Sequence, residues 1–71
     1  MSNDTRKRLE ILLKHWAKHN REHSEEFVRW ADTAKDFGET AHDAILAAAQ
    51  QMEKANEFLL QALDSLKEGE S

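Results

Sequence analysis

The chain has 71 residues, with neither cysteine nor proline, and 34% of its residues are charged. This length allows one small domain with a modest core, and the lack of cysteine excludes disulfides and thiolate metal sites. No apolar run approaches the roughly 20 residues that span a bilayer, which excludes a membrane partner. The first residues lack the apolar core of a signal peptide, so the predicted location is cytoplasmic.

Charge is distributed unevenly along the chain. The net charge is −4, and this mild acidity argues against a general nucleic-acid binder, because phosphates are bound mainly by Lys and Arg. Residues 1–21 carry six basic and two acidic side chains, whereas residues 22–71 carry four and twelve. Such polarity could orient two copies with their ends reversed, so that the positive end of one meets the negative end of the other.

Heptad spacing predicts two helices in a single domain that covers residues 1–71. The first helix is expected over about residues 5–37 and the second over about 41–68. Gly38 suits the left-handed position that follows a helix, and Thr40 can cap the next helix. The prediction is therefore an all-α, antiparallel two-helix hairpin with its turn at residues 38–40.

The apolar positions of both helices follow unbroken steps of four and three residues. In the first helix they are Leu9, Leu13, Trp16, Asn20, His23, Phe27, Trp30, Ala34 and Phe37. In the second they are Ala41, Ile45, Ala48, Met52, Ala55, Leu59, Ala62 and Leu66. Heptads of this kind are typical of helices that cross at a shallow angle.

The second helix has a wider apolar face than one neighbouring helix can cover. We therefore expect a homodimer in which two hairpins form a four-helix bundle. The alternative is a monomeric hairpin whose apolar side binds a client protein.

Two polar residues, Asn20 and His23, interrupt the predicted apolar seam. With the turn centred on Gly38, Asn20 is expected opposite Asn56, and His23 opposite Glu53. Asn20 and Asn56 would then form a polar core layer. A buried asparagine at a heptad position commonly fixes register and oligomeric state, so this layer has a structural interpretation that needs no ligand.

Histidines recur one helical turn apart, and they suggest a metal site. His15, His19 and His23 share one arc of the helix with Glu22 and Glu26. Two imidazoles at this spacing can bind one ion, and a carboxylate can join them or orient an imidazole. The expected inner ligands are His19, His23 and Glu26, followed by Glu53 or Glu22, with His15 as an outer ligand. A donor set of imidazole and carboxylate suits Ni²⁺, Co²⁺, Zn²⁺ or Cu²⁺. The alternative is a solvated helix surface on which His23 is an ordinary core histidine.

The stretch from Leu12 to His23, with Phe27, Trp30-Ala31 and Ala55-Asn56, is distinctive. It resembles a pattern in short, uncharacterised bacterial and archaeal α-hairpin proteins associated with nickel or cobalt handling and hydrogenase maturation. The resemblance covers most of residues 9–63, and the matching positions are His15, His19, Asn20, Glu22 and His23. It implies metal binding but supplies no established ligand set.

Two functional hypotheses follow. The first is a metal-binding helical dimer that carries, stores or senses Ni, Co or Zn ions. The second is a non-catalytic structural or protein-interaction module whose Asn/His layer only fixes helix pairing. Enzymatic activity is not expected, because the chain has no Cys or Tyr and no Ser on a glycine-bearing turn that could present a nucleophile.

Overall fold

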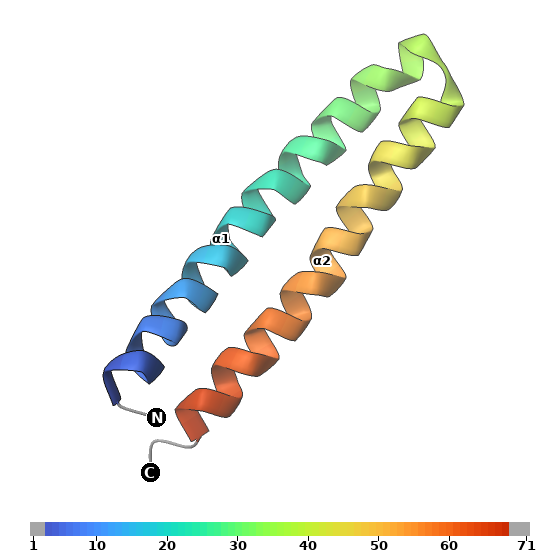
Figure 1. The fold of residues 1–71 in the computed structure, drawn as a ribbon. Helices are drawn as coiled ribbons and strands as arrows, with labels where there is room; N and C mark the ends of the chain where they lie inside the picture. Colours follow the sequence, from blue (N-terminus) through green and yellow to red (C-terminus); the bar gives the residue numbers. More distant parts are fainter. Residues whose placement is uncertain (1–2, 69–71) are drawn as a thin grey trace.

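A computed structural model describes residues 3–68 of the chain, and it shows an antiparallel helical hairpin (Figure 1). The element order is α1 (Asn3–Ala34), the short 3₁₀ helix η1 (Lys35–Phe37) and α2 (Glu39–Glu68). The hairpin measures 52 × 14 × 14 Å. The predicted all-α hairpin fold is therefore confirmed, and residues 3–68 contain no strand. Neither helix in this range has an apolar stretch long enough to cross a membrane.

The turn between the helices begins earlier than expected. The α-helical part of α1 ends at Ala34, and the chain reverses through η1 and Gly38. Gly38 has φ 137° and ψ 150°, a conformation that other residues rarely adopt. Its N–H donates to the Lys35 carbonyl (3.4 Å), and its own carbonyl accepts from the N–H of His42 (3.3 Å). The earlier reversal changes which residues of α1 and α2 lie opposite each other.

The seam between α1 and α2 is built largely from small residues. Its buried members are Leu13, Ala17, Ser24, Ala31, Ala34, Ala49, Asn56 and Leu63. One predicted row is confirmed, because Leu13 and Ala34 are buried and Phe27 is half-buried. The other row was placed one residue too early. Ala17 and Ala31 occupy the seam, while the preceding Trp16 and Trp30 are 41% and 61% exposed.

Three polar side chains each donate a hydrogen bond across this seam to an alanine carbonyl of the opposite helix. Asn56 Nδ2 donates to the Ala17 carbonyl (2.9 Å), and Ser24 Oγ donates to the Ala49 carbonyl (3.3 Å). Near the turn, His42 Nδ1 lies 2.7 Å from the Ala31 carbonyl and donates to it. The small alanines let the helices approach closely enough for these side chains to reach the opposite backbone. We call these contacts the three polar rungs.

Candidate functional site

The three histidines of α1 form a continuous row of imidazole rings. His15 stacks on His19 with centroids 5.8 Å apart, and His19 meets His23 edge-on at 4.4 Å. The Nε2 atoms of His19 and His23 lie 2.9 Å apart. His15 and His19 are exposed and His23 is half-buried beside Phe27, so the row runs from solvent to the edge of the core.

The separation of the two Nε2 atoms allows two kinds of chemistry. In the absence of an ion, one imidazole donates its N–H and the other accepts. In a tetrahedral zinc site with Zn–N bonds of about 2.0–2.1 Å, two nitrogen ligands lie roughly 3.3 Å apart. A separation of 2.9 Å corresponds to the right angle of a tetragonal ion such as Ni²⁺ or Cu²⁺ with similar bond lengths. We call the paired rings of His19 and His23 the His19–His23 clamp.

Of the other expected ligands, the structure places His15 and Glu22 beside His19. Glu22 lines a shallow hollow of about 190 Å³ with His15, Lys18 and His19. Within residues 3–68, no group of three or more His, Asp or Glu side chains is placed to hold a metal ion.

Two expected carboxylate ligands lie in other surroundings. Glu26 lines a separate, mainly apolar hollow with Trp30. Glu53 accepts a hydrogen bond from Ser24 Oγ (3.4 Å), so its expected contact with His23 was wrong. His23 pairs with His19 instead.

The expected pairing of Asn20 with Asn56 was also wrong. Asn56 is 8% exposed and bonds to the Ala17 backbone, whereas Asn20 is half-buried at the edge of the seam. Both residues line a hollow of about 300 Å³, and the buried Asn56 Oδ1 has no hydrogen-bond partner within the described chain. The physical cause is the early turn, which sets Asn56 opposite Ala17 instead of Asn20. The polar layer thus exists, but its acceptors are backbone carbonyls.

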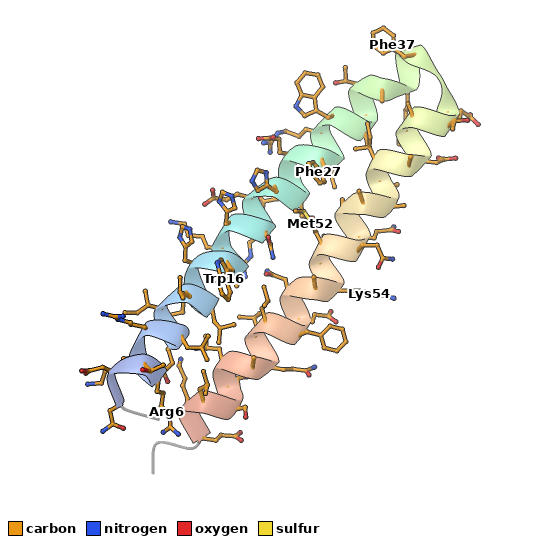
Figure 2. The ribbon with its side chains drawn as sticks, viewed as in Figure 1. Arg6, Trp16, Phe27, Phe37, Met52 and Lys54 are labelled. Carbon is orange, nitrogen blue, oxygen red and sulfur yellow. The ribbon has the colours of Figure 1, made fainter. Side chains whose placement is uncertain are left out.

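One side of the hairpin carries an extensive apolar surface, which we call the aromatic–alanine face. On α1 it presents Trp16 and Trp30 (Figure 2 labels Trp16), and Phe37 of η1 is 84% exposed. On α2 it presents the exposed row Ala41, Ala48, Ala55 and Ala62. The sequence pattern had assigned these residues to the contact between α1 and α2.

A hollow of about 400 Å³ opens on this face beside Trp30. It is lined by Phe27 and Trp30 of α1, by Ala44, Ile45 and Ala48 of α2, and by Glu26 at its edge. Sequence reasoning missed this hollow. The sequence feature that could have predicted the hollow is the row of alanines, which leaves space on α2 at the height where α1 carries a tryptophan.

Comparison with known families adds a classification. The profile of a domain of unknown function, DUF8180, matches residues 9–66, which include both helices and the turn. The chain belongs to the DUF8180 family. No curated protein and no solved structure matches the chain. The DUF8180 description names no activity or ligand, so the resemblance to nickel- and cobalt-handling hairpins stays a prediction.

The DUF8180 match spans both features on which a functional argument can rest. These are the His19–His23 clamp, which runs from the exposed His19 to the half-buried His23 of α1, and the aromatic–alanine face that α1 and α2 share.

Proposed function

We propose that this DUF8180 hairpin is a non-catalytic assembly module that pairs with a second copy to form a four-helix bundle. The supporting observation is that the apolar stripes of α1 and α2 do not point at each other. The exposed residue precedes the seam residue on both helices, as Trp16 precedes Ala17 and Ala55 precedes Asn56. Both stripes are therefore turned toward the same side of the hairpin, which is where the axis of a four-helix bundle would lie.

The energetics support the same conclusion. A large aromatic side chain offers about 150–250 Å² of surface, and Trp16 and Trp30 leave 41% and 61% of theirs exposed. At roughly 25 cal/mol per Å², covering these parts on both copies contributes on the order of 10 kcal/mol. This gain is comparable to the free-energy cost of association, so the remaining apolar surface of the face decides whether the dimer is stable.

The polar rungs support a structural role for the buried polar residues. Ser24, His42 and Asn56 each direct a side-chain donor to the backbone of the opposite helix. A carbonyl that already accepts its helical N–H has a second lone pair for this bond. The three groups therefore hold the two helices together in one register.

Sedimentation equilibrium tests the proposal directly. The wild-type chain is expected to have twice the 8.2 kDa mass of one copy, and Trp30→Glu is expected to lower the association constant at least 100-fold, because it places a charge in the apolar interface. Val28→Glu is the matched control, since Val28 is also exposed on α1 but lies outside the aromatic–alanine face. A wild-type mass of 8.2 kDa at millimolar concentration would contradict the proposal.

Transition-metal binding is a second candidate function, which the His19–His23 clamp favours. The hairpin would then carry, store or sense an ion such as Ni²⁺, Co²⁺ or Zn²⁺, with the remaining ligands supplied by water or another molecule. The candidate is supported by the 2.9 Å separation of the two Nε2 atoms.

Calorimetric titration with these three ions distinguishes the clamp from ordinary surface histidines. We expect micromolar or tighter binding by the wild-type chain and at least a 100-fold loss in the double variant His19→Ala/His23→Ala. Binding should weaken as the pH falls, because an imidazole must be deprotonated to act as a ligand. His15→Ala is the control and should keep most of the affinity. Equal affinities of the wild type and the double variant would rule out the clamp.

A further inference from the structure

We infer how the second copy is oriented on the aromatic–alanine face. The twofold axis of the dimer runs parallel to the long axis of each hairpin. The α1 helix of each copy therefore packs on α2 of the other copy, and both turns lie at the same end of the bundle. This inference rests on the proposed function and extends it from the fact of pairing to its geometry. The observation that leads to it is that Trp30 protrudes beside an apolar hollow on the same face.

Trp30 and the hollow lie at matching heights along the hairpin. The bond between His42 and the Ala31 carbonyl sets the register near the turn. Trp30 immediately precedes Ala31. The α2 residues that line the hollow, Ala44, Ile45 and Ala48, follow His42 by two to six residues. A twofold axis parallel to the helices keeps every height and exchanges α1 with α2. It therefore places the Trp30 of each copy over the hollow of the other, which is the self-complementarity that a twofold interface requires.

The same operation fits the middle and the open end of the hairpin. The bond between Asn56 and the Ala17 carbonyl places Trp16 at a height between those of Ala55 and Ala62. The partner's α2 therefore offers a space between small residues, and Trp16 enters it as a knob enters a hole. Leu12 and Phe58, which are 44% and 68% exposed, flank this level and become covered as well.

The size of the face is adequate for a stable dimer. A surface along the 52 Å length and 14 Å width of the hairpin offers about 700 Å² on each copy, or about 1,500 Å² in total. Specific interfaces bury about 1,200–2,000 Å² in total. A second copy of this chain thus supplies enough surface without any further protein.

Charges at the rim agree with this orientation. The heptad positions that border the face bring Arg8 near the partner's Glu68 and Glu22 near the partner's Lys54. The end-reversed arrangement would set α1 against α1, and full overlap of the two hairpins would bring Arg8 near the partner's Arg29. The overall charge polarity of the chain favours that reversed arrangement, but exposed charges contribute little over long distances in salt. Shape complementarity therefore decides the orientation.

Spin labelling at the turn tests the orientation. The chain has no cysteine, so Asp36→Cys gives one label on an exposed residue of each copy. Pulsed electron paramagnetic resonance should give a distance of about 20–30 Å between the two labels, because helices in a bundle pack 8–10 Å apart and the label arms add the rest. The end-reversed dimer would give a distance near the 52 Å length of the hairpin.

A second label near the middle of α2, Gln50→Cys, serves as the control. It should report a short distance in either orientation, and it therefore shows that labelled dimers have formed. A short distance at Gln50→Cys with a long one at Asp36→Cys would overturn the orientation and leave the assembly module intact. A mass of 8.2 kDa without dipolar coupling at either label would overturn both.

Discussion

Replacement of Ala49 by leucine is expected to lower the free energy of unfolding by about 1–3 kcal/mol, the usual cost of inserting methylene groups into a packed interior. Ala49 is 1% exposed, and its carbonyl accepts the Ser24 hydroxyl across the seam. A larger side chain would push the helices apart there and lengthen that bond. The loss should be visible as a lower midpoint of chemical denaturation.

Ala47→Leu provides the matched comparison for this change. Ala47 is exposed on α2, two residues away from Ala49. The same chemical change at a solvated helical position should alter stability by no more than about 0.5 kcal/mol. Equal destabilisation by the two variants would show that the close approach of the helices at Ala49 is not the cause.

Leu63→Ala is expected to cost more, about 2–5 kcal/mol, because it leaves a cavity in the seam. Leu63 is 6% exposed and is the largest of the buried side chains of α2. A chain of 71 residues has about 4–11 kcal/mol of total stability, by the usual value per residue. The variant should therefore lose much of its helical circular dichroism on mild heating, at temperatures where the wild type stays folded.

Leu60→Ala shows whether the loss of stability depends on burial or only on the change from leucine to alanine. Leu60 is 39% exposed, so its truncation removes less contact and should cost at most about 1 kcal/mol. All variants must be compared at one protein concentration, since association of folded chains adds to their apparent stability. A Leu63→Ala variant no less stable than Leu60→Ala would mean that the seam is not packed as described.

The sequence predicted the two helices and one row of the seam correctly for a physical reason. Large apolar residues such as Leu13 and Phe27 are half-buried or buried in any arrangement of this hairpin, and their spacing shows in the pattern. The second row was missed because alanine and serine contribute little to the hydrophobic pattern of a sequence. Ala17 and Ser24 occupy the seam, whereas the stronger signals of Trp16 and His23 lie one residue earlier.

The candidate site was predictable only within α1. The helical spacing of His19 and His23 is a local property, and the structure places their Nε2 atoms 2.9 Å apart. Contacts between the helices depended on the turn, which sequence reasoning placed at residues 38–40. The reversal through η1 displaced Asn56 from Asn20 and Glu53 from His23. An error of a few residues in a turn is carried along the full length of the hairpin.

The polar rungs also bear on how such a hairpin can change over evolution. Each acceptor is a main-chain oxygen, which every amino acid supplies, so no matching side chain has to arise on the opposite helix. A donor at position 24, 42 or 56 can therefore be exchanged for another hydrogen-bonding side chain of similar reach without a matching change on the opposite helix. Only the alanine opposite each donor must stay small. Substitutions are therefore tolerated less well at the alanine than at the donor of each rung.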